Sequence, residues 1–173
     1  MQNIFAKITD EYNHLKTIDR VHYEIHEGCF FSHTVSTTVI ATSTYFVVLE
    51  NSATNYAHAQ FMVTASASLD AALYESPTAA STWSAETVYN HFRASTNAAT
   101  LTIRKNVPSS DITSTGTLLE SITVGSGSNP ANMIGGSANS RSEWILNKGT
   151  KYLVKLNSAS TNTITFATHW YED

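Results

Sequence analysis

Charged side chains are scarce in this chain of 173 residues, because Asp, Glu, Lys and Arg make up only 14% of it. Ordinary globular domains carry about a quarter. The formal net charge at pH 7 is −4, and no run of basic residues occurs along the sequence. A protein that binds a phosphate backbone needs clustered Lys and Arg. Nucleic acid is therefore not expected as a partner.

Cysteine and long apolar runs are also scarce. Cys29 is the single cysteine, so no disulfide within the chain can hold the fold together. No apolar run approaches the roughly 20 residues that a membrane-spanning helix needs. Lys7, Asp10 and Glu11 interrupt the first residues, where a signal peptide would have an unbroken apolar stretch. We expect neither a membrane segment nor a signal peptide.

Motifs of catalysis are missing as well. The sequence has no Gly-x-Ser-x-Gly elbow, no His-Glu-x-x-His helix and no pair of carboxylates in an apolar context. Cys29 has no base and orienting group arranged around it in the sequence. No Gly-x-x-x-x-Gly-Lys-[Ser/Thr] loop is present to cradle a phosphate. We expect no enzymatic activity and no cofactor.

Ser and Thr are abundant and together make up about a quarter of the chain. Thr is β-branched and fits a pleated strand, and both residues cover an exposed sheet face without adding charge. Apolar residues alternate with them at period two, which argues against disorder outside the loops and the N-terminus. This combination is typical of a β-protein.

Segments with strand alternation follow one another from Val35 onward, separated by Ser, Asn, Gly and Pro. Helical periodicity of useful length is absent after the N-terminal segment. With about eight to ten strands, the simplest closure is an all-β, antiparallel two-sheet sandwich of jelly-roll type. The sandwich is expected to span residues 22–173, after a short N-terminal arm at residues 1–21.

The stretch Glu143–Glu172 carries the clearest strand pattern. We expect its two strands to form an antiparallel β-hairpin that buries one apolar face in the core. The residues of that face are Tyr152, Val154 and Leu156 in the first strand, and Ile164, Phe166, Thr168 and Trp170 in the second.

An apolar stripe runs through the N-terminal segment and consists of Ile4, Phe5, Ile8, Tyr12 and Leu15. Its spacing fits a short helix capped by Thr9 or Asp10, and it fits an extended arm equally well. The stripe is too small to be an independent core, so the segment either docks on a partner or packs loosely on its own domain. We predict that it serves docking and that the sandwich closes without it.

Several histidines occur near the start of the sandwich. On a strand, His22, Glu24 and His26 would project from one face, and with His33 or His169 they would form a cluster of metal-binding type. The expected cupin pattern, a His-x-His pair followed by a spaced Glu and a distant third His, is absent. We therefore favour surface or interface histidines and expect no bound metal.

Two loops stand out by composition. Glu75 to Glu86 carries the isolated Trp83, and Gly125 to Ser142 is long and rich in glycine. Trp83 is either an exposed anchor for a partner or a sugar ring, or a side chain that caps one end of the sandwich. We favour the second interpretation.

Three short motifs occur in a fixed order along the chain. They are Ile25-His26-Glu27-Gly28 followed by Phe30 and Phe31, Glu143-Trp144-Ile145-Leu146 with Gly149-Thr150-Lys151-Tyr152-Leu153, and Trp170-Tyr171-Glu172. In this order, within one Thr-rich β-protein, they resemble the head decoration (auxiliary capsid) proteins of tailed bacteriophages. The resemblance covers about Tyr23 to Asp173. Cys29 and the long N-terminal segment depart from the family's pattern.

The resemblance implies a virion structural protein, without catalytic residues, that assembles as a homotrimer on the capsid exterior. Its partners would be the major capsid protein and further copies of itself. The apolar stripe of the arm is then the candidate docking surface, and His22, His26 and Trp83 are candidate interface residues. One alternative is a carbohydrate-binding module of a tail fibre or baseplate, with Trp83 exposed. Another is a cupin-like metalloenzyme that uses His22, His26 and a carboxylate.

Overall fold

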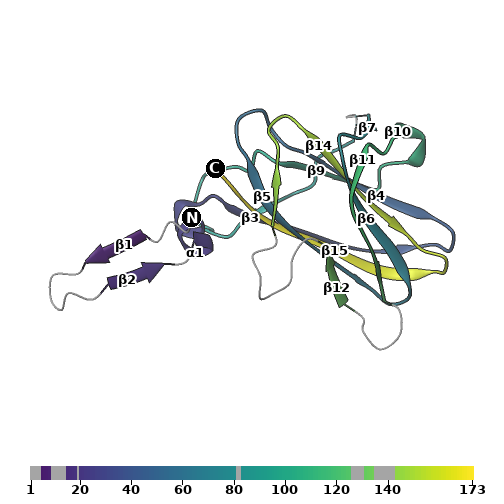
Figure 1. Cartoon of the computed structure of the whole chain (residues 1–173), viewed down its shortest axis with the longest axis horizontal. Coiled ribbons are helices and arrows are strands. Elements are labelled where there is room, and N and C mark those ends of the chain that lie inside the picture. Colours follow the sequence, from purple (N-terminus) through teal and green to yellow (C-terminus); the bar gives the residue numbers. More distant parts are fainter. Residues whose placement is uncertain (1–4, 9–14, 19, 81–82, 126–130, 135–142) are drawn as a thin grey trace.

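The computed structural model describes residues 5–8, 15–18, 20–80, 83–125, 131–134 and 143–173. Strands dominate these residues, and two large antiparallel sheets pack against each other (Figure 1). The predicted all-β sandwich is confirmed. None of the described helices is long and apolar enough to cross a membrane.

The first sheet has the strand order β12-β5-β15-β3-β8, and β13 also pairs with β5. These strands are β12 (Ala131–Ile134), β5 (Ala57–Ala65), β15 (Asn162–Glu172), β3 (Phe30–Val39), β8 (Tyr89–Asn90) and β13 (Trp144–Leu146). The second sheet has the order β11-β6-β14-β4-β9. Its strands are β11 (Thr117–Val124), β6 (Leu69–Glu75), β14 (Lys151–Asn157), β4 (Thr44–Glu50) and β9 (Thr102–Lys105).

Four shorter strands and two short helices are the remaining described elements. They are β1 (Phe5–Ile8), β2 (Leu15–Ile18), α1 (Arg20–Glu27), β7 (Thr78–Ala79), the 3-10 helix η1 (Ser109–Asp111) and β10 (Ile112–Ser114). Strands β1 and β2 pair with each other, and so do β7 and β10.

The path of the chain between the two sheets is that of a jelly roll. The chain alternates between the first and second sheets through β3, β4, β5 and β6. Strand β11 pairs with β6 in the second sheet. The alternation then resumes with β12 in the first sheet, β14 in the second and β15 in the first. Two interleaved Greek keys of this kind define the jelly roll. The large sheets are antiparallel throughout the described pairings.

The predicted C-terminal hairpin is wrong in its pairing. Strand β14 lies between β4 and β6, whereas β15 lies between β3 and β5 in the other sheet. The chain changes layer between them, where the buried Ser158 hydroxyl donates to the carbonyls of Ser68 and Ser160 at 3.3 and 2.6 Å. Alternation tells which face of a strand is apolar, but it does not tell which strand lies beside it.

The predicted core faces are confirmed. Tyr152, Val154 and Leu156 of β14 and Ile164, Phe166 and Trp170 of β15 are each at most 2% exposed and belong to one cluster between the sheets. Thr168 is 1% exposed. A second, smaller cluster contains Phe46, Val48, Val107 and Leu153, and explains why β4, and β14 at Leu153, also carry buried apolar side chains on the outer face.

The buried Tyr152 also fastens the turn that precedes β14. Its hydroxyl accepts a hydrogen bond from the Asn147 amide and donates one to Glu75 Oε1, both at 2.9 Å. Burial, together with the Glu75 carboxylate, raises the pKa of Tyr152 to about 12, although the Asn147 amide acts in the opposite direction.

Tyr152→Phe should therefore change how stability depends on alkaline pH. Above pH 10, the ordinary value, the unfolded chain loses this phenolic proton while the folded chain keeps it, so stability falls as pH rises toward 12. We expect Tyr152→Phe to cost about 1–3 kcal/mol at neutral pH, because the Asn147 amide and Glu75 each lose a partner. We also expect the free energy of unfolding of Tyr152→Phe, measured by urea denaturation, to fall less between pH 9 and 11 than that of the parent chain. If the free energy of unfolding fell equally in the two chains over this pH range, Tyr152 would not be the cause of the pH dependence.

Candidate docking site

The N-terminal arm is an antiparallel hairpin, in which Phe5 pairs with Ile18 and Ile8 with Leu15. Among the described strands, β1 and β2 belong to neither large sheet. Figure 1 shows them to one side of the sandwich, beyond α1. The extended alternative of the sequence analysis is therefore the one observed for these strands. Ile4, Thr9, Asp10 and Tyr12 lie outside the described residues.

The short helix α1 links the arm to the first sheet, where a strand was expected. Its end is a Schellman cap, because Gly28 has a φ of 72° and the amides of Gly28 and Cys29 donate to the carbonyls of Ile25 and Glu24 at 3.0 and 2.9 Å. A side chain at position 28 would also collide with Ser95, whose Oγ lies 2.3 Å from an added Cβ. Glycine is therefore required where the helix ends.

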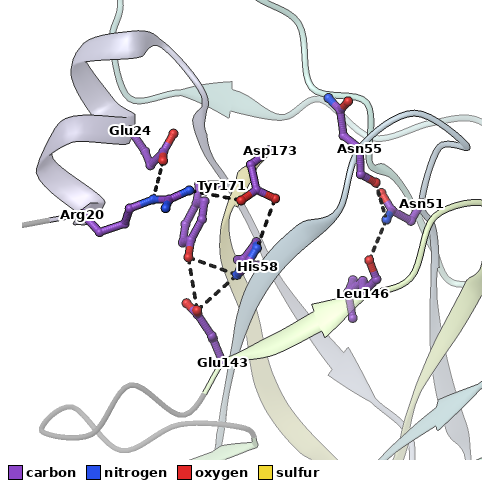
Figure 2. A network of polar contacts seen from close by, with 9 residues as sticks. All are labelled: Arg20, Glu24, Asn51, Asn55, His58, Glu143, Leu146, Tyr171 and Asp173. Carbon is purple, nitrogen blue, oxygen red and sulfur yellow. Dashed lines mark hydrogen bonds and ion pairs between the residues drawn. The ribbon is translucent and has the colours of Figure 1, made fainter. Parts of the chain in front are cut away.

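Arg20 fastens the start of α1 to the C-terminus of the chain. Its Nε donates to Glu24 Oε1 at 2.6 Å and its Nη2 to Asp173 Oδ2 at 3.1 Å (Figure 2). The guanidinium carbon also lies 5.4 Å from the centroid of the Tyr171 ring. Glu24 is only 6% exposed, so this carboxylate faces the body of the protein and needs the charge of Arg20.

Tyr171 and Asp173 continue these contacts into the first sheet through His58. The imidazole Nδ1 lies 3.1 Å from Glu143 Oε1, and Nε2 lies 3.2 Å from Asp173 Oδ1. The Tyr171 ring stacks on His58 at 4.4 Å, and its hydroxyl donates to Glu143 Oε1 at 3.1 Å. Burial and the Glu143 carboxylate raise the pKa of Tyr171, so it remains a neutral donor.

We call these six residues the anchor network: Arg20, Glu24, His58, Glu143, Tyr171 and Asp173. Glu143 and Tyr171 belong to the three sequence motifs, whereas Arg20, His58 and Asp173 were not predicted as site residues. The sequence signal that could have found Arg20 was its spacing of four residues from Glu24, because side chains at this spacing can form an ion pair on a helix.

Parts of all three motifs that carry the family resemblance meet at one end of the first sheet. Phe31 stacks on Trp170 with ring centroids 5.8 Å apart, and the Glu172 amide donates to the Cys29 carbonyl at 3.2 Å. The hydrogen bond from Tyr171 to Glu143 joins the other two motifs. Residues more than a hundred positions apart thus form one structural unit next to α1.

The histidines do not gather into the cluster that a strand at residues 22–26 would have allowed. On α1, His22 and His26 are exposed and their Nε2 atoms lie 3.0 Å apart. His33 is buried, with Nδ1 3.1 Å from the Thr87 carbonyl oxygen. His169 faces His91 instead, and partial burial together with His91 lowers its pKa. The described residues contain no group of three or more His, Cys, Asp or Glu side chains placed to hold a metal.

Trp83 packs against the smaller core cluster, on the outer side of the second sheet. Its indole Nε1 donates to Asp111 Oδ2 at 3.0 Å, and its carbonyl oxygen accepts from the Arg104 guanidinium. The ring is half-buried, so Trp83 contributes to packing. It packs on the outer face of the second sheet and does not cap an end of the sandwich as expected. Most of the loop Gly125 to Ser142 lies outside the described residues.

The described part of the chain offers little room for a small-molecule substrate near the anchor network. A cavity of about 60 Å³ is lined by residues that include His58, Glu143, His169 and Tyr171. Ligand pockets commonly measure about 300–1,000 Å³. Cys29 is also a poor nucleophile, because burial and the carboxylates of Glu24, Glu27 and Glu172 raise the pKa of its thiol.

Comparison of the chain with family models, curated proteins and solved structures found no match. The fold and the geometry of the arm and anchor network are therefore the basis for assigning a function.

Proposed function

We propose that this chain is a virion structural protein that decorates and stabilises the exterior of a bacteriophage capsid. The observation that carries the proposal is the two-stranded arm, set to one side of a rigid jelly roll and joined to it by α1. The anchor network fixes the base of α1 to the sheet. The three sequence motifs of the resemblance support the same assignment.

A decorating protein must hold on to a shell made of many identical subunits. Linked contacts strengthen attachment, because once one contact forms the others become intramolecular. A body with a separate arm can contact two neighbouring coat subunits at once. In this proposal the major capsid protein is the partner, the arm reaches across its surface, and the jelly roll provides the rigid support.

The three central strands of the first sheet suggest how copies associate. Strands β3, β5 and β15 contain no Lys, Arg or Asp, and their single acidic residue is Glu172. Exposed positions on β3 are occupied by Thr34, Ser36 and Thr38. An uncharged face loses its water at low cost, and homo-oligomers usually have closed symmetry, which the resemblance implies is three-fold here. We propose that this face contributes to a homotrimer.

Light scattering at micromolar concentration should give the mass of three 18.9 kDa chains. Thr34→Lys puts a charge in the middle of the uncharged face and should lower the measured mass. Thr117→Lys, at an exposed position on β11 in the other sheet, is the matched control and should leave the trimer intact. A monomer in the parent chain would refute the trimer.

Deleting residues 2–19 should leave a folded trimer that binds its capsid at least tenfold more weakly, which corresponds to about 1.4 kcal/mol. The reason is that β1 and β2 pair only with each other among the described strands, so the sandwich does not need them. Thermal unfolding checks the fold, and cosedimentation with purified undecorated heads measures binding. Arg20→Ala keeps the arm but removes the contacts of Arg20 with Glu24 and Asp173. Its capsid binding should lie between that of the parent chain and that of the truncated chain.

Two results would contradict the role proposed for the arm. Unfolding of the truncated chain would place the arm in the core. Undiminished binding would place the docking surface elsewhere, with the loops Glu75 to Glu86 and Gly125 to Ser142 as the next candidates. The carbohydrate-binding alternative relied on an exposed Trp83, and the half-buried ring bonded to Asp111 does not favour it.

A further inference from the structure

Helix α1 brings His22 and His26 together on its exposed side. Their Nε2 atoms lie 3.0 Å apart, and the ring centroids are separated by 4.7 Å. This proximity depends on the helix, because four residues of a strand, at about 3.3 Å each, would separate the two backbone positions by about 13 Å. The pair is therefore a feature of the folded protein.

We propose that His22 and His26 chelate a divalent transition metal through their Nε2 atoms. Imidazole nitrogen is a good ligand for copper, nickel and zinc. Two histidines four residues apart on one helix are also the spacing with which zinc-binding helices hold their metal. This site differs from the cluster considered in the sequence analysis, because it needs neither His33 nor His169.

The separation of the two nitrogens is close to the separation that neighbouring ligands of one metal ion require. With metal–nitrogen bonds of about 2.1 Å, nitrogens 3.0 Å apart subtend about 90° at the metal. That is the angle between neighbouring ligands in square-planar or octahedral geometry, which suits Cu²⁺ or Ni²⁺. Tetrahedral Zn²⁺ would require a separation of about 3.4 Å. The two side chains as they lie match copper or nickel, whereas zinc would require them to move slightly apart.

The backbone that carries the pair is fixed before a metal arrives. Arg20 pairs with the buried Glu24 at 2.6 Å, and the cap at Gly28 fixes the other end of α1. Only the two side chains must be ordered by the metal, which lowers the cost of binding. Because the described residues contain no third ligand in reach, water completes the coordination sphere.

Calorimetric titration of the full-length chain with Cu²⁺ should show one site per chain, and electron paramagnetic resonance should show a tetragonal signal with coupling to two nitrogens. His22→Gln and His26→Gln should each weaken binding at least tenfold. His91→Gln, which removes an exposed histidine in the loop after β8, is the matched control and should not weaken it. Ni²⁺ should bind at least as tightly as Zn²⁺. Saturating Cu²⁺ should raise the melting temperature of the parent chain and of His91→Gln by the same amount, and that of His22→Gln and His26→Gln by less.

A variant that combines His26→Gln with Glu27→His keeps the number of histidines but moves the second one off the shared helix face. It should lose the two-nitrogen signal while keeping the melting temperature of the metal-free parent. Unchanged Cu²⁺ affinity in this variant or in either single variant would overturn the proposal, and so would a clear preference for Zn²⁺ over Ni²⁺. The inference does not depend on the capsid proposal, so either can fail alone.

Discussion

Val154→Asp should abolish folding of the chain. Val154 is fully buried in the centre of β14, where it pairs with Val47 of β4 and Leu73 of β6, and all three belong to the core between the sheets. An unpaired carboxylate there has no hydrogen-bond partner and no water. We expect a loss of more than about 4 kcal/mol, a large part of the about 5–15 kcal/mol that holds a domain together.

The matched control is Lys155→Asp, one residue further along the same strand. Lys155 lies on the opposite face and is partly exposed, so the same new side chain should cost only about 1 kcal/mol or less. Circular dichroism and urea denaturation of both variants provide the comparison. A soluble Val154→Asp chain with an unchanged melting temperature would mean that this face of β14 has been assigned wrongly.

Glu172→Ala should be the next most damaging change, at about 3–5 kcal/mol. The Glu172 carboxylate is 6% exposed and accepts hydrogen bonds from the amides of Thr100 and Leu101. It also accepts from the Thr100 hydroxyl at 2.7 Å and from the indole of the buried Trp170 at 2.9 Å. Alanine would leave these buried and partly buried donors without an acceptor, and a buried donor costs about 1–3 kcal/mol when unpaired.

Glu172→Gln separates the role of the acceptor from that of the charge. It keeps one acceptor oxygen at the same place, so we expect roughly half the loss caused by alanine. Urea denaturation of the two variants measures the difference. If Glu172→Ala lost less than about 1 kcal/mol, water would have to replace the carboxylate, and the segment before β9 would not depend on it.

The strands of the sandwich could be predicted from the sequence because each alternates clearly. Tyr152, Val154 and Leu156 face the core as expected, and so do Ile164 and Phe166. Their pairing could not be predicted in the same way. A jelly roll places consecutive strands in different sheets, whereas local alternation suggests that they are neighbours, so the hairpin of β14 with β15 was the wrong inference.

Helix α1 was missed because eight residues are too few for a clear helical period. His22, Glu24 and His26 also fit a strand, and the choice depended on the glycine at position 28, which caps a helix as readily as it turns a strand. The helix determines which of these side chains are exposed. On the helix, Glu24 turns inward to Arg20 while the two histidines remain exposed.

The anchor network could be predicted only in part. Glu143 and Tyr171 belong to the motifs of the resemblance, but His58 lies between apolar and small residues on β5, where nothing in the sequence distinguishes it. Its contacts with Glu143 and Asp173 join residues 85 and 115 positions apart. Such contacts follow from the order of strands in the sheet, which the sequence did not reveal.

Electron microscopy of purified undecorated heads, incubated with the full chain and with the chain lacking residues 2–19, tests the central claim most directly. The account predicts regular three-lobed density on the outer surface of the capsid with the full chain, joined to the coat through the arm, and much weaker density with the truncated chain. Bare heads after saturation with the full chain, or density confined to the tail, would contradict it.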